Sequence, residues 1–157
     1  MPDKTCSIYL KHPTIKGEAT GDYDGAINVD SVSFNVSRNS SPKENNLWND
    51  VAAVGGQIIL TRFADKASSD CFFEACKKPK PGTGAQHDMS LHFVQSSGEE
   101  FFSIELVNCQ ISGYTFSGDS KTEQPVEVIT ISFHELKEKH MDGQKRGWNF
   151  GDNTEAS

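Results

Sequence analysis

The sequence predicts a mainly β protein, either an antiparallel β-barrel or a two-sheet sandwich, with one α-helix. Apolar and polar residues alternate over 27–38 and again from Val126 onward. Strict alternation is typical of a half-buried strand, because successive side chains point to opposite faces. In both segments the alternation changes phase, between Val29 and Val32 and again after Val128. A phase change indicates a bulge or a sharp bend, and bent strands let a small sheet curl into a barrel or an orthogonal sandwich.

The N-terminal half is expected to contain strands joined by turns that are rich in Gly and Asp. The expected elements are strands at 6–10, 27–38 and 57–63, turns at 16–19 and 21–25, and a polar loop at 39–50.

One helix is expected, over 65–78. Asp65 and Ser68 are candidate caps, and the prolines that follow Lys78 end the helical pattern. Its apolar stripe is expected to consist of Phe72, Phe73 and Cys76.

The C-terminal half is expected to be strands again. The expected strands cover 88–95, 101–116 with a kink at Gly113, and 126 to about 134 or beyond, with turns at 96–99 and 118–124. No linker divides the chain, so 1–157 is predicted to be a single domain with a frayed tail over about 152–157.

Composition excludes several classes of function. The net charge of -7 argues against nucleic acid and against anionic membrane surfaces, since both need a basic patch. The longest apolar run is too short to span a bilayer, so no membrane insertion is expected. Residues 1–6 contain no apolar stretch of signal-peptide length. We therefore expect folding in the cytoplasm, with any export by a route that needs no cleaved signal.

The four cysteines are Cys6, Cys71, Cys76 and Cys109. Their spacing matches no zinc ribbon and no CxxC redox motif. We expect small, buried hydrophobic side chains that stay reduced.

Two sets of polar residues are candidates for a metal site or a catalytic site. His92 and His134 lie on polar strand positions, where Glu135 or Asp88 would complete a metal site if the strands were neighbours. The second set is Glu99, Glu100 and Glu105, whose carboxylates could pair to catalyse hydrolysis. The chain has no HExxH pair, no GxSxG elbow and no phosphate-binding loop. Solvated strand faces are favoured, and we expect no catalysis, no cofactor and no metal.

The polar loop over 39–50 carries Leu47 and Trp48. Long loops are usually functional or disordered, and a large apolar side chain in one indicates that it docks on something. The alternative is that Trp48 folds back over its own barrel as a lid.

The chain resembles a known family over nearly its whole length. The matching segments are 15–18, 27–29, 55–56, Leu60 to Ser68 with its Asp-Lys pair, 75–76 and 147–149. Their order and spacing together resemble the Hcp (haemolysin-coregulated protein) family, the tube protein of bacterial type VI secretion.

The resemblance implies a β-barrel protomer, six of which close into a hexameric ring with a wide channel. Rings are expected to stack into a tube that a contractile sheath propels, together with spike and baseplate components. The protein is expected in the bacterial cytoplasm and is then secreted with small effector proteins, which it carries or chaperones. Because the sequence stops at Ser157, we expect the plain tube form without a toxin domain.

Two sets of site residues follow from the resemblance. The contact between protomers or between stacked rings is expected at Leu47, Trp48 and Val51. Polar strand residues that are candidates to line the channel are Asn28, Asp30, Ser31, Ser33 and Asn35. Alternatively, these residues face the outer solvent, because alternation does not say which face of the sheet lines the channel.

Other classes of function stay open beside the tube subunit. One is a monomeric β-barrel binding module that captures a ligand or peptide through the loop with Leu47 and Trp48. The other, more distant, is an enzyme with a His/Glu site. Oligomeric state separates the first alternative from the tube subunit, and metal content separates the second.

Overall fold

A computed structural model describes residues 6–47, 51–77 and 87–156. Its strands are β1 (Cys6–Lys11), β2 (Ile27–Val29), β3 (Ser31–Phe34), β4 (Gln57–Phe63), β5 (His87–Gln95), β6 (Glu100–Ser117), β7 (Val126–His140), β8 (Arg146–Asn149) and β9 (Thr154–Ala156). The helix is α1 (Ser68–Cys76), and two 3-10 turns, η1 (Gly21–Tyr23) and η2 (Glu44–Asn46), lie between strands. Within these ranges no helix is long and apolar enough to cross a membrane.

The strands pair only antiparallel, in the order β2-β1-β5-β6-β7-β4-β3, with β8 and β9 added beside β7. The two ends of this order, β2 and β3, are consecutive in the chain and are separated by Asp30 alone. The Asp30 N–H donates to the Thr61 carbonyl of β4 at 2.9 Å. The sheet therefore closes on itself, and the predicted fold class, a mainly antiparallel β-barrel with one helix, is confirmed.

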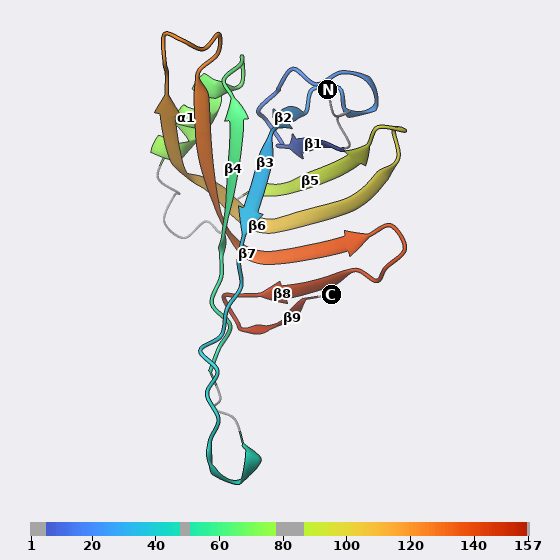
Figure 1. Ribbon diagram of the computed structural model, residues 1–157, viewed down its shortest axis with the longest axis vertical. Coiled ribbons are helices and arrows are strands. Elements are labelled where there is room, and N and C mark those ends of the chain that lie inside the picture. Colours follow the sequence, from blue (N-terminus) through green and yellow to red (C-terminus); the bar gives the residue numbers. More distant parts are fainter. Residues whose placement is uncertain (1–5, 48–50, 78–86, 157) are drawn as a thin grey trace.

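The long strands β6 and β7 each take part in two differently oriented halves of the barrel. Figure 1 shows β7 running beside β4 and then turning to lie along β8, and β6 running along β5 and then turning to follow the first half of β7. In β6 the backbone of Asn108 has φ 53°, in the left-handed region that asparagine tolerates better than most residues. The predicted kink at Gly113 is also present, as a register shift between Ile111 and Gly113.

The first predicted bend is confirmed, although the predicted strand over 27–38 is shorter than expected. The chain changes direction at Asp30, so that β2 pairs with β1 and β3 pairs with β4. Beyond Phe34 it leaves the sheet, and an isolated bridge joins Ser37 to Val54.

The second predicted phase change is wrong in position. Along β7 the buried residues are Glu127, Ile129, Ile131 and Phe133, so the inward face continues through the place where the apolar pattern breaks. The pattern breaks because an acidic residue, Glu127, occupies an inward position. The inward face changes parity later, between Phe133 and Leu136, where β7 bends.

The core fills the inside of the barrel with aliphatic side chains from most strands. Its fully buried members are Leu10, Ile27, Ile58, Leu60, Leu91, Leu106, Ile129 and Ile131. Burial of one such side chain stabilises the fold by about 1.5–3 kcal/mol.

The helix is shorter than predicted, and its apolar stripe was predicted wrongly. Phe72 and Phe73 are 54% and 58% exposed, Cys76 is exposed, and the buried residue of α1 is Cys71. Cys71 and the partly buried Ala75 are four residues apart, so they share the face that packs on the core.

The entry to α1 is held by reciprocal hydrogen bonds, as predicted for Asp65 and Ser68. The Asp65 N–H donates to Ser68 Oγ at 2.9 Å, and the Ala67 N–H donates to Asp65 Oδ1 at 2.8 Å. This arrangement resembles a capping box, which satisfies backbone donors that the first helical turn leaves unpaired.

The tail predicted to fray is ordered through Ala156. β9 pairs with β8, and the Trp148 indole N–H donates to Asn153 Oδ1 at 3.2 Å. The hairpin continues the sheet because β8 in turn pairs with the second half of β7.

Candidate functional site

The most prominent feature outside the barrel is an arm formed by residues 35–56, which leaves the barrel after β3 and returns at β4. Figure 1 shows it extending far beyond the strands. Two hydrogen bonds join its sides, Ser37 N–H to the Val54 carbonyl at 3.0 Å and Val54 N–H to the Ser37 carbonyl at 2.7 Å. At its base the Phe133 N–H donates to the Gly56 carbonyl at 2.9 Å. The arm is therefore fixed at the barrel, while its far end has no barrel residues beside it.

The three residues predicted to make assembly contacts lie in different places. Leu47 follows the η2 turn and is 60% exposed. Val51 is partly buried, and Trp48 lies outside the described residues. The η2 turn is closed by the Lys43 N–H, which donates to the Leu47 carbonyl at 2.6 Å. A large apolar side chain is thus presented to solvent near the far end of the arm.

An open groove of about 690 Å³ lies between the arm and the β8–β9 hairpin, and we call it the arm-base groove. Its apolar lining comes mainly from Phe34, Val36, Val51, Ala53, Leu136 and Trp148. Charged residues Arg38, Glu138 and Arg146 also line it. Sequence reasoning placed Val51 in a contact but did not anticipate a groove, because the second strand of the hairpin, β9, lies in the tail at 152–157 that was expected to be frayed.

The five channel candidates are all exposed on the outer face of the barrel. Ser31 and Ser33 lie opposite Thr61 and Ile59 of β4, so they belong to one continuous exposed sheet face. Asp30 has a structural task as well, because its Oδ2 accepts the Phe63 N–H at 3.1 Å. Exposure fits both a channel lining and an outer surface, so the channel assignment stays a prediction.

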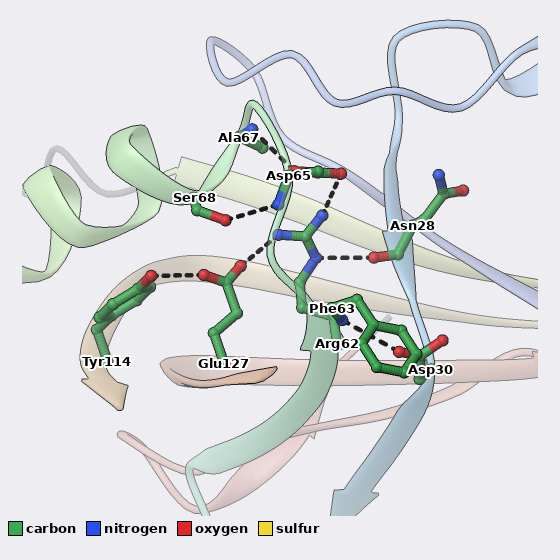
Figure 2. Close-up of polar contacts among 9 residues, drawn as sticks. All are labelled: Asn28, Asp30, Arg62, Phe63, Asp65, Ala67, Ser68, Tyr114 and Glu127. Carbon is green, nitrogen blue, oxygen red and sulfur yellow. Dashed lines mark hydrogen bonds and ion pairs between the residues drawn. The ribbon is translucent and has the colours of Figure 1, made fainter. Parts of the chain in front are cut away.

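A buried ionic cluster that sequence reasoning missed lies beneath these strands (Figure 2). Arg62 is 1% exposed, and its guanidinium forms ion pairs with Glu127 and, at 2.5 Å, with Asp65. Its Nε–H donates to the Asn28 carbonyl at 2.8 Å, and the Tyr114 hydroxyl donates to Glu127 Oε2 at 2.5 Å. The signal was present in the sequence, because Arg62 follows Ile58 and Leu60 at inward parity.

Two pKa values report the environment of this cluster. Burial alone would lower the pKa of Arg62, but the carboxylates of Asp65 and Glu127 outweigh it and raise that pKa. Burial and the hydrogen bond to Glu127 raise the pKa of Tyr114 to about 12. Both groups keep their protons at neutral pH, so the cluster joins β2, β4, β6, β7 and the start of α1.

The proposed metal site of His92 and His134 is not formed. β6 lies between β5 and β7, so the strands that carry the two histidines are not neighbours. No group of three or more metal-binding side chains occurs in the part of the chain that the structure describes.

His92 instead belongs to an anchor for the η1 turn. Its ring contacts Glu100 through Nδ1 and Ser90 Oγ through Nε2 at 2.8 Å. The Tyr23 hydroxyl donates to Glu100 Oε1 at 3.1 Å, and the Tyr23 ring stacks on Tyr9 with centroids 4.6 Å apart. Burial, with the Glu100 hydrogen bond, raises the pKa of Tyr23 to about 12. These contacts hold the turn against the sheet.

The Ser90, His92 and Glu100 side chains follow the order of a hydrolytic triad, but other parts of such a site are lacking. β5 is paired with β1 and with β6 at Ser90, so the local backbone offers no free pair of N–H groups for an oxyanion. Glu105, the other proposed carboxylate, forms an ion pair with Lys145 at 2.7 Å. Glu100 and Glu105 therefore have separate partners, His92 and Lys145, and do not form the carboxylate pair that was considered and not favoured from the sequence.

A closed antiparallel β-barrel with one helix is the protomer fold that the resemblance in the sequence implied. The family described as "Type VI secretion system effector, Hcp" matches residues 9–140. The chain belongs to this family, and the family resemblance seen in the sequence is confirmed. No curated protein sequence matches the chain.

Solved structures with the same fold include several Hcp proteins. A structure titled as a type six secretion system protein has 19% identity and a TM-score of 0.82, covering 96% of this chain and 99% of that one. Hcp1 from Salmonella typhimurium has 20% identity and a TM-score of 0.78, covering 98% and 100%. The sheath-tube complex of an extracellular contractile injection system has 14% identity and a TM-score of 0.56, covering 85% and 88%.

Proposed function

We propose that this chain is a subunit of the inner tube of a type VI secretion system, which closes into hexameric rings that stack into a tube. The family match over residues 9–140 is the observation that carries the proposal. The similarity of fold to a chain of the sheath-tube complex of an extracellular contractile injection system supports it. A closed barrel suits a building block, since a heterologous contact repeated by rotation closes a ring.

The arm is the element that we assign to contacts between stacked rings. It extends beyond the barrel and carries Leu47, which is 60% exposed, next to Trp48. An exposed apolar side chain that projects from the barrel marks an interaction site. Docking through a projection that already has a defined backbone costs little conformational entropy, which favours a specific contact. Val51 supports the arm from the groove at its base.

For the channel lining we propose the exposed polar face of β2 and β3. It includes Asn28, Asp30, Ser31, Ser33 and Asn35, which offer hydroxyl, amide and carboxylate groups, and it continues onto β4, where Ile59 is 44% exposed opposite Ser33. A mainly polar wall of this kind lets a passenger protein slide without binding tightly. Effector proteins carried in the channel are the cargo that the proposal implies.

The remaining partners follow from the same proposal. The tube runs inside a contractile sheath and contacts spike and baseplate components, and the chain passes from the cytoplasm to the outside through the type VI system. We assign it no catalytic step, because the buried charges hold strands together and the exposed histidine–glutamate pair anchors a turn.

Electron microscopy of the purified chain tests the proposal. We expect end-on views with six-fold symmetry and side views of stacked rings. A variant in which residues 39–53 are replaced by a short Gly-Ser linker should keep the rings and lose the stacks. Particles without rotational symmetry in the unmodified protein would overturn the proposal.

A further inference from the structure

Helix α1 shows an unusual distribution of side chains for the surface of a soluble protein. It buries a cysteine, Cys71, and exposes two phenylalanines, Phe72 at 54% and Phe73 at 58%. Phe116, at the end of β6, is 56% exposed. Phe72 lies edge-on to Tyr114, two residues before Phe116, with ring centroids 5.9 Å apart. We call Phe72, Phe73 and Phe116 the aromatic patch.

Large aromatic side chains bury about 150–250 Å² each when they are covered, and contiguous exposed apolar surface marks interaction sites. Acidic side chains flank this patch on the same helix. Asp70 is exposed, whereas Glu74 forms an ion pair with Lys77 at 2.9 Å, and the Lys77 ammonium lies 4.8 Å from the centre of the Phe73 ring. The patch therefore fits a partner surface that is apolar at its centre and offers a positive group to Asp70.

The arm-base groove has these properties on the same chain. Its apolar wall includes Val36, which is 50% exposed, and Trp148, which is 36% exposed. Arg38 and Arg146 line it, and the Arg146 side chain is 72% exposed. One acidic residue, Glu138, lines it as well, and the Arg146 guanidinium forms an exposed ion pair with Glu155 at 4.0 Å. Arg38 therefore supplies the positive charge on the arm side of the groove.

The patch and the groove lie on different parts of the barrel. α1 packs against β6, whereas the groove is bounded by β7, β8 and the arm. Figure 1 shows the helix near one end of the long axis, away from the β8–β9 hairpin. Two different and complementary surfaces on one chain form a heterologous contact, the kind that closes into a ring when the rotation allows.

We propose that the aromatic patch of one copy of this chain seats in the arm-base groove of the next copy around the ring. Asp70 then faces the arginines at the groove, and the phenylalanines cover Val36 and Trp148. This inference rests on the proposed ring function and names the pair of surfaces that closes the ring. It also gives the arm base a role within a ring that is separate from the role of the arm's far end between rings.

The test uses two variants that each remove one half of the contact. Phe72→Glu with Phe73→Glu disables the patch, and Val36→Glu with Arg38→Glu disables the groove. All four residues are exposed, so the barrel should fold, which circular dichroism checks. Met141→Glu, a 41% exposed apolar residue in the β7–β8 turn, is the matched control. We expect both double variants to be monomers and the Met141 variant to assemble as the unmodified chain does.

Mixing the two double variants distinguishes this pairing from a general loss of assembly. The intact patch of the groove variant can bind the intact groove of the patch variant, and no further contact can form. At high protein concentration we expect a species of about 35 kDa, two chains of 17.3 kDa, by light scattering. Only monomers in the mixture, or rings formed by either variant alone, would overturn the pairing.

The unmodified chain separates the two proposals. If it forms hexamers while the patch variant also does, the pairing fails and the ring function stands. If the unmodified chain is a monomer at every concentration, the ring function fails and the pairing fails with it.

Discussion

Glu127 holds Arg62 inside the barrel, with the carboxylate 0% and the guanidinium 1% exposed. The second carboxylate oxygen of Glu127 accepts the Tyr114 hydroxyl at 2.5 Å (Figure 2). Asp65 binds the other side of the guanidinium at 2.5 Å. Because Asp65 also caps the entry to α1, one buried arginine connects the closing strand of the barrel to the helix.

Removing one partner of this ion pair should destabilise the protein strongly. Glu127→Leu leaves the guanidinium buried with one carboxylate fewer, which typically costs about 3–5 kcal/mol in the free energy of unfolding. Urea unfolding at pH 7, followed by circular dichroism, measures this change.

The double variant Arg62→Met with Glu127→Leu is the control for that prediction. It removes both fully buried charges and should be less destabilised than Glu127→Leu alone, because the remaining charge, Asp65, is 10% exposed and still accepts the Ala67 N–H. Tyr114→Phe should cost about 1.5–3 kcal/mol, the range for a hydrogen bond to a charged group. A Glu127→Leu variant as stable as the parent would mean that the cluster is open to water.

Stability should fall as the pH falls from 7 to 5 because of His12. This residue is 6% exposed, and its Nδ1 accepts the Thr14 and Ile15 N–H groups at 3.1 and 3.0 Å. Burial, with the nearby His87, lowers the pKa of His12 from 6.5 to about 4. The unfolded chain binds a proton in this window and the folded chain does not, so the stabilisation is complete above 6.5 and is lost toward 4.

Between pH 7 and pH 5 the expected loss from His12 is about 2 kcal/mol in the free energy of unfolding. The groups that face His12 from neighbouring elements are His87, Glu74, Lys16 and Lys77. His12→Asn keeps an acceptor for the backbone N–H groups and should flatten the pH dependence. The urea midpoint as a function of pH tests this, and an equal slope in both proteins would contradict it.

The buried thiols should react only when the protein unfolds. Burial, and for Cys71 the neighbouring Glu127 charge, raises the pKa of Cys71 and of Cys109 to about 12. Since the thiolate is the reactive form, both groups are inert at neutral pH. In a Cys6→Ser, Cys76→Ser variant we expect labelling by a thiol reagent at the rate of unfolding. Complete labelling within minutes in native buffer would be inconsistent with this burial.

Trp48→Ala and Leu47→Ala should weaken tube assembly while leaving the β fold intact, because Leu47 is 60% exposed outside the barrel and Trp48 follows it directly in the sequence. Sedimentation of tubes measures assembly, and circular dichroism measures folding. Val54→Ala, at a 65% exposed apolar position near the base of the arm, is the matched control. Unchanged sedimentation of the Trp48 and Leu47 variants would remove the arm's far end from the stacking contact.

Most of the fold could be predicted from alternation and turn residues, because both are local. β4 was predicted with its observed bounds, and the bend after Val29 falls where the outward parity changes at Asp30 and Ser31. Glu127 could not be placed, because an acidic residue at an inward position is indistinguishable by pattern from a change of face. Its partner, Arg62, is 65 residues away in the sequence.

The helix and the surface were harder to predict for a related reason. A helix with phenylalanines at two successive positions was assumed to bury them, whereas α1 packs on β6 through its small residues, Cys71 and Ala75. The groove forms between the arm and the C-terminal hairpin, which are far apart in the sequence. No local sequence pattern indicates a contact of this kind. Assembly surfaces of this kind violate the rule that apolar residues point inward.

Light scattering on a sizing column measures the solution mass, which decides whether the chain forms the proposed ring of six. One chain is 17.3 kDa, so a closed ring of six would have a mass of about 104 kDa. We expect that mass for the unmodified chain, and a smaller mass for the patch variant. A mass near 17.3 kDa for the unmodified chain over a wide range of concentration would contradict it.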